Sequence, residues 1–179
     1  SSVRHLLDRL RGGISGGDRV QASALARALY DNGGLVGYAV NQIALYSVPV
    51  WPQASTEDRD ANRILEKFFY DWADRCDFLG RQEFDIGALQ TQICQALDLD
   101  GDIGVAIVGD AGFPQLQLVE GWRIGNPITS APEKDVIDGV KVDSKGRVIG
   151  YVVDVGGKPV PVPSSQMILV REPSIVSPY

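Results

Sequence analysis

The sequence has little of what most catalytic and metal sites need. Its 179 residues include one histidine, His5, and two cysteines, Cys76 and Cys94. A catalytic base must be held by a folded scaffold, and His5 precedes a glycine-rich stretch that offers none. Zinc sites use three or four protein ligands, which this set cannot supply at short range. Two cysteines also make no secreted disulfide framework, so we expect a reduced, cytoplasmic place of assembly.

Basic clusters and long apolar runs are missing as well. The net charge is -6, and the densest basic stretch is the loose scatter of Arg4, Arg9 and Arg11. Each phosphate contact to duplex DNA needs a lysine or arginine, so tight DNA binding is disfavoured. An acidic surface can still let DNA pass without gripping it. No apolar run is long enough to cross a bilayer, and the glycines form no phosphate-binding loop, so we expect neither a membrane partner nor a cofactor.

The N-terminal residues 1–17 are expected to form a flexible arm. Val3–Leu10 has the spacing of a short helix, and the glycines between Gly12 and Gly17 make a hinge that is costly to order. Leu6 and Leu10 are therefore candidate interface residues, which would reach onto a neighbouring molecule.

Residues 18–100 are expected to be helical. Apolar spacing and stop signals predict four helices, over Ala22–Asp31, Leu35–Ser47, Glu57–Cys76 and Ile86–Leu97. Ser55 with Asp58 resembles a capping box ahead of the third helix. Its apolar stripe is predicted to be core: Ala61, Leu65, Phe68, Phe69, Trp72 and Cys76, with Phe84 beyond it. The third and fourth helices are joined by a short loop, which predicts that they pack antiparallel.

Residues 101–179 are expected to be rich in β-strands. Short β-type runs fall at Ile103–Val108, Gln115–Glu120, Val136–Asp143, Val148–Asp154 and Met167–Val170. The turn Ser144-Lys145-Gly146 predicts a hairpin, and prolines beside Val160 and Val162 restrict that stretch to a sheet edge. Helices followed by strands indicate an α+β fold with a mostly antiparallel β region.

Three alternating carboxylates, Asp98, Asp100 and Asp102, form the most prominent local motif. They are the candidate metal ligands of the chain, since such oxygens could converge on Ca²⁺. An EF-hand loop requires glycine and glutamate where this chain has Ile103 and Gly109, so only half of that pattern is present. The same residues also suit a turn between a helix and a strand.

Trp51 lies between Pro49 and Pro52 in a short loop. An aromatic side chain in such a loop packs on a neighbour, either within the same fold or in another subunit. The sequence leaves both choices open, and Trp51 is a third candidate interface residue.

Several ordered stretches resemble the lambda-type family of tailed-phage portal proteins. A tryptophan-containing helix with the turn after it corresponds to Phe69–Asp77 with Gly80 and Phe84, and a D-G-D turn corresponds to Asp100–Asp102. An apolar strand corresponds to Gln115–Glu120, followed by Arg123, Ile124 and Pro127. A hairpin corresponds to Asp138–Arg147, followed by Tyr151. The chain departs from the family near Ile168–Val170, where the family usually carries a histidine, and matches before Phe69 are poor.

This resemblance implies the peripheral wing of a portal subunit, with the stem and clip regions absent from the chain. It implies a structural protein of the virion that does no bond chemistry. Such a protein forms a ring of about a dozen identical copies, a dodecamer, at the capsid vertex. Its expected partners are capsid and scaffold proteins, the terminase, head-tail connector proteins, and DNA that passes through the ring without sequence-specific binding.

Two other readings stay open from the residues alone. One is a small soluble α+β interaction module that forms no ring. The other is a hydrolase that depends on carboxylates or a metal and uses Asp98, Asp100 and Asp102.

Overall fold

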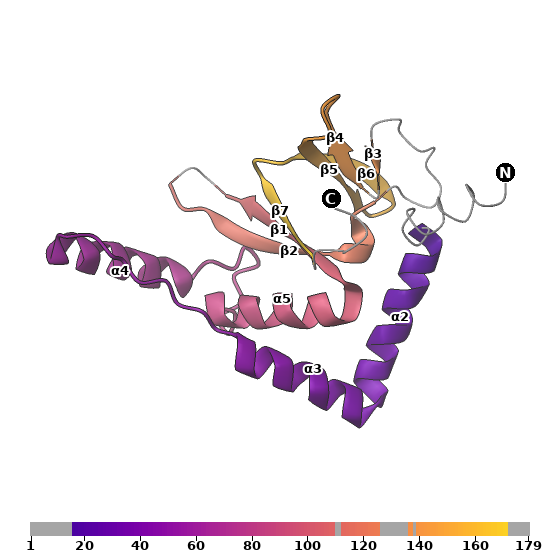
Figure 1. Ribbon diagram of the computed structural model, residues 1–179, viewed down its shortest axis with the longest axis horizontal. Coiled ribbons are helices and arrows are strands. Elements are labelled where there is room, and N and C mark those ends of the chain that lie inside the picture. The colour runs from indigo at the N-terminus through magenta and orange to yellow at the C-terminus, as the bar shows by residue number, and fades with distance from the viewer. Residues whose placement is uncertain (1–15, 110–111, 126–135, 138, 172–179) are drawn as a thin grey trace.

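The computed structural model describes residues 16–109, 112–125, 136–137 and 139–171 (Figure 1). Four helices precede the strands, which confirms the α+β fold: α2 Gly16–Asn32, α3 Gly34–Ser47, α4 Arg59–Ala73 and α5 Ile86–Asp100. Helix α2 begins inside the predicted glycine hinge, ahead of the predicted start at Ala22. The predicted helix Val3–Leu10, with His5, Leu6 and Leu10, lies outside the described residues. No helix in the described part of the chain is long and apolar enough to cross a membrane.

The strands form two antiparallel sheets. The three-stranded sheet has the order β2-β1-β7, and the four-stranded sheet has the order β3-β4-β5-β6. Their bounds are β1 Asp102–Val108, β2 Gln115–Glu120, β3 Val136–Ile137, β4 Val140–Val142, β5 Val148–Val155, β6 Lys158–Pro163 and β7 Met167–Arg171. The predicted hairpin is confirmed as β4–β5. The proline-rich β6 lies at a sheet edge, where missing N–H donors are tolerated.

An antiparallel helix pair is present, but its members are not the predicted ones. Helix α3 runs antiparallel to α5, because Asn41 bonds Gln95 while Val50, further along the chain, bonds Gln90, earlier in α5. The prediction that the helix over 57–76 would pack along α5 is wrong. Helix α4 instead projects from the body of the molecule (Figure 1).

Two apolar clusters form the core and join the layers. In the first, Cys76 and Leu89 are completely buried where the end of α4 meets α5, and Leu116 and Leu118 of β2 pack against them. The predicted burial of Cys76 is thereby confirmed. The second cluster joins the two sheets: Val119, Ile124, Val153 and Met167. Ile124 and Val153 also pair through an isolated bridge between the sheets.

At the turn that contains Gly139, we expect the addition of a single methyl group to lower the stability of the fold strongly. Gly139 has a φ of 77°, and an added Cβ would lie 2.7 Å from the Cα of Gly125 and from the carbonyl carbon of Ile124. Backbone atoms cannot move aside cheaply. We therefore expect Gly139→Ala to lower the free energy of unfolding by about 3 kcal/mol, measured by urea denaturation.

Gly146→Ala provides the matched control. Gly146 has a similar φ of 79°, and nothing lies within 4 Å of its added Cβ. Only the left-handed conformation is penalised there, at about 1 kcal/mol. Equal losses for both variants would show that the backbone approach at Gly139 contributes nothing.

Candidate functional site

An extended segment and helix α4 together form an arm over residues 49–73. The segment runs back along the helix: Trp51 packs edge-on to Phe69 at 6.4 Å between ring centroids and tilted on Tyr70 at 5.8 Å. Further out, the backbone N–H of Ala54 donates to the Glu66 carboxylate. Trp51 therefore packs within its own subunit, and its role at an interface stays a prediction.

Helix α4 starts with a cap other than the one predicted. The Asp58 carboxylate accepts hydrogen bonds from the backbone N–H groups of Asp60 and Ala61, as an N-cap residue does. The predicted capping box, led by Ser55, is wrong. Thr56 instead bonds Asn62 through both its backbone and its hydroxyl group. These bonds hold the extended segment against the first turn of the helix.

The arm is attached to the body only near its base. The Trp72 indole N–H donates to the Pro114 carbonyl oxygen at 2.6 Å, and the Arg75 guanidinium lies over the Phe113 ring at 5.2 Å. Ala73 joins the buried cluster around Cys76. The last turn of α4 is thus fixed to the β1–β2 connection, while its earlier turns project away from the described body (Figure 1).

Part of the apolar stripe of α4 is exposed, contrary to the prediction that it would be core. Phe68 is 69% exposed, and Ile64 and Leu65 are also more than half exposed. Only Phe69 and Trp72, with Phe84 beyond the helix, are packed against the buried cluster. The helix therefore carries an apolar surface that no other described part of the chain covers. We call Ile64, Leu65 and Phe68 the α4 stripe.

Helix α3 presents a second uncovered apolar surface. Gly37, Val40 and Ala44 are buried on one side of it. The opposite side, by helical spacing, carries four exposed side chains: Leu35, Tyr38, Leu45 and Tyr46. No Asp, Glu, Lys or Arg occurs in Gly34–Ser47. We call these four residues the α3 face.

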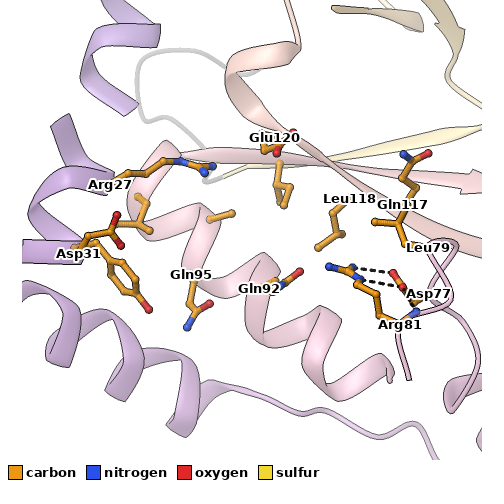
Figure 2. A pocket seen from close by; sticks show the side chains of 14 residues that line it. Arg27, Asp31, Asp77, Leu79, Arg81, Gln92, Gln95, Gln117, Leu118 and Glu120 are labelled. Atoms are coloured by element: carbon orange, nitrogen blue, oxygen red, sulfur yellow. Dashed lines mark hydrogen bonds and ion pairs between the residues drawn. The ribbon is translucent and has the colours of Figure 1, made fainter. Parts of the chain in front are cut away.

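A cleft of 440 Å³, lined by both polar and apolar side chains, lies between α2, α5 and β2 (Figure 2). Arg27 and Asp31 of α2 lie at one end, and the pair of Asp77 and Arg81 lies at the other (Figure 2). Gln92 of α5 lies between them. Amides and paired charges dominate its polar groups, and no cysteine or histidine is among the described residues that line it. Such a lining offers hydrogen bonds and paired charges.

Asp77 and Arg81 form the most completely bonded ion pair in the described residues. The Asp77 carboxylate is almost fully buried and accepts bonds from the Arg81 backbone N–H, Nε and guanidinium at 2.9–3.1 Å. The Arg81 guanidinium also stacks on the Phe84 ring at 3.7 Å. Its side-chain hydrogen bonds lower the pKa of Asp77, against the opposing effect of burial. The pair closes the turn that follows α4.

The three candidate metal ligands are not brought together. Asp100 Oδ2 accepts a bond of 2.6 Å from Arg27 of α2, and Asp98 is exposed on the outside of α5. Asp102 begins β1 after Gly101, whose φ of 82° ends the helix. Among the residues that the structure describes, no group of three His, Cys, Asp or Glu side chains is placed to hold a metal ion. The interpretation of this motif as a turn is confirmed.

The cysteines are poor nucleophiles. Burial raises the pKa of the Cys76 thiol to about 11, and its Sγ donates to the Ala73 carbonyl oxygen. Burial also raises the pKa of Cys94. Both groups are therefore thiols at neutral pH, whereas a thiolate is the reactive form.

Comparison with known proteins decides the family. Residues 14–174 match the family described as "Phage portal protein, lambda family". The chain belongs to the lambda family of phage portal proteins. The resemblance carried by Phe69–Asp77 and the later motifs is thereby confirmed, and the match extends well ahead of Phe69. Portal proteins are structural proteins of the virion.

Two solved structures share the fold of this portal protein chain. One, titled "Neck of empty GTA particle computed with C6 symmetry", has a TM-score of 0.58 at 17% identity over 86% of this chain. Another, titled "Virion of native gene transfer agent (GTA) particle", has a TM-score of 0.55 at 16% identity over 86% of it. The chain spans 37% and 35% of those chains, so it corresponds to about a third of their length. No curated protein matches significantly.

Sequence reasoning missed the features that dominate the surface. Periodicity located the stripe on α4 but could not tell whether anything covers it. Arg27 gave no sign of its partner Asp100, which lies 73 residues further along the chain. The absence of any charge between Gly34 and Ser47 was visible in the sequence and could have pointed to the α3 face.

Proposed function

We propose that this chain is the peripheral wing of a portal subunit, in a ring at the capsid vertex. The match of residues 14–174 to the portal family carries the proposal. In this role the ring passes DNA during packaging and ejection. It also docks the terminase and head-tail connector proteins, and performs no bond chemistry itself.

The surface properties of the chain support this role. Its net charge is -6, which suits a ring that DNA passes through without being tightly bound. Subunits in a ring meet head to tail, so each needs two different adhesive faces. The α4 stripe and the α3 face are two different uncovered apolar surfaces on one subunit.

Imaging of the intact protein tests the proposal. We expect negative-stain micrographs of the purified, full-length polypeptide in moderate salt to show closed rings with a central hole. Single small particles at micromolar concentration, from an intact chain, would contradict the portal role and leave the soluble interaction module in its place.

A further inference from the structure

Helix α4 has one apolar side and one charged side. Four of its charged residues form two ion pairs, Arg63 with Asp60 at 3.4 Å and Lys67 with Asp71 at 2.7 Å. By helical spacing Asp60, Lys67 and Asp71 flank the α4 stripe on the side of Ile64, and Arg63 lies further round the helix. The stripe can therefore be covered by another apolar surface without burying an unpaired charge, which would be costly.

The exposed area of the α4 stripe is large enough to contribute to an interface. Ile64, Leu65 and Phe68 together leave on the order of 350 Å² exposed, which is in the range of the largest apolar patch on a typical monomer, and such patches are often functional. One side of a standard interface buries about 800 Å², of which a little over half is apolar. Most of that apolar share is thus already present on these three side chains.

Helix α3 of the same chain offers a second apolar surface. The α3 face is apolar and uncharged, and Leu35 is 82% exposed on it. Helix α4 projects at one end of the molecule, while the start of α3 lies beside α2 at the other end (Figure 1). A contact between the α4 stripe of one copy and the α3 face of the next joins two different surfaces, and repeating that contact gives a head-to-tail assembly.

We propose that the α4 stripe of one subunit packs on the α3 face of the neighbouring subunit in the ring. The inference rests on the proposed portal function and names the surfaces through which the wings meet. The arm at residues 49–73 reaches out from each subunit, and its stripe is covered by α3 of the next copy.

A pair of cysteines in one chain tests this contact directly. We place Phe68→Cys and Tyr38→Cys together in the intact protein and treat the assembled rings with a short bismaleimide cross-linker. The expected result is a ladder of covalent oligomers on a denaturing gel, up to the subunit number of the ring. The wild-type protein is the background control for Cys76, which is buried, and for Cys94, which is partly buried; burial raises the pKa of both thiols.

The single-cysteine variants fix the orientation of the contact. Each alone should give no cross-linked species, and an equal mixture of the two should give covalent dimers only. Dimers from Phe68→Cys alone would mean that α4 pairs with α4, and a cross-link within one chain would mean that α4 folds back. Either result overturns the inference. Rings that give no ladder of cross-linked oligomers also overturn it, but they remain consistent with the proposed portal function. If the wild-type protein forms no rings, the portal function itself fails.

Serine substitutions measure what the contact contributes. We expect Leu65→Ser with Phe68→Ser to lower the yield of rings by more than about tenfold at a fixed protein concentration, because two anchor side chains are lost at every interface. The control is Arg63→Ser with Lys67→Ser, two exposed residues that by helical spacing point away from Leu65 and Phe68 on the same helix, and it should assemble like the wild type. The residues of both pairs are exposed in the subunit, so circular dichroism should show the same fold in all variants. Equal ring yields from both pairs would overturn the inference.

Discussion

Replacing Asp77 by asparagine is expected to lower the free energy of unfolding by about 2–3 kcal/mol at neutral pH. The carboxylate accepts three hydrogen bonds from Arg81, and its side chain is only 4% exposed. Asparagine keeps the shape but loses the charge and at least one acceptor. Arg81 is a third exposed, and solvent screening there keeps the expected loss below that of a fully buried pair.

The pH dependence of stability separates this ion pair from simple packing. Hydrogen bonds from Arg81 lower the pKa of Asp77 in the folded protein. Its contribution is therefore fully present above the unfolded-state pKa, about 3.9, and is lost as the pH falls through the lower folded-state value. The stability difference between wild type and Asp77→Asn should be constant from pH 5 to 7. It should shrink below about pH 4.

Asp71→Asn is the matched control for this measurement. Asp71 also pairs with a cation four residues away, Lys67, but both side chains are more than half exposed. We expect a loss of about 0.5 kcal/mol or less there. Urea denaturation across the pH range measures both variants. A difference for Asp77→Asn that persists unchanged at pH 2.5 would show that the charge of Asp77 is irrelevant.

The elements that the sequence predicted well are those defined by local signals. The stretch Leu35–Ser47 is α3 within one residue, and the Ser144-Lys145-Gly146 turn does join β4 to β5. Asp143 accepts bonds from the backbone N–H groups of Lys145 and Arg147 in that turn. Such signals act over a few residues, so a single sequence contains them.

The partner of each surface could not be predicted in the same way. An apolar stripe in a sequence indicates that one face of a helix is covered, but it does not identify the surface that covers it. Phe68 and Trp72 lie on the same stripe of α4, yet Trp72 packs on its own body while Phe68 is exposed. The short loop after α4 suggested packing along α5. In the structure α4 projects outward instead, and the Trp72–Pro114 bond fixes its last turn to the β1–β2 connection.

Removing Arg27 is expected to have the largest effect of any single ion-pair change. Its guanidinium donates to both oxygens of Asp100, at 2.6 and 3.3 Å, and the Asp100 side chain is only 1% exposed. Arg27→Ala leaves this carboxylate buried without its arginine partner. We expect a loss of about 3 kcal/mol in the free energy of unfolding, because an uncompensated buried charge is costly.

A double-mutant cycle shows how much of that loss comes from the charge. Asp100→Asn removes the buried charge that Arg27→Ala would leave without its partner. The double variant should therefore be more stable than Arg27→Ala alone by about 1–2 kcal/mol. The control is Arg63→Ala, whose partner Asp60 is exposed, and it should change stability by about 0.5 kcal/mol or less. Additive losses in the cycle would mean that Arg27 acts through packing rather than through Asp100.

The bond between Arg27 and Asp100 also joins α2 to the end of α5, and α2 packs on α3. Its loss should release α2 before the rest of the molecule unfolds. Hydrogen exchange in Arg27→Ala should then rise first in Gly16–Asn32 and leave the sheet of β1, β2 and β7 protected. Helix α2 flanks the start of α3, so loosened helices should also weaken assembly through the α3 face. Faster exchange spread evenly over the chain would instead mean that this ion pair stabilises the fold as a whole.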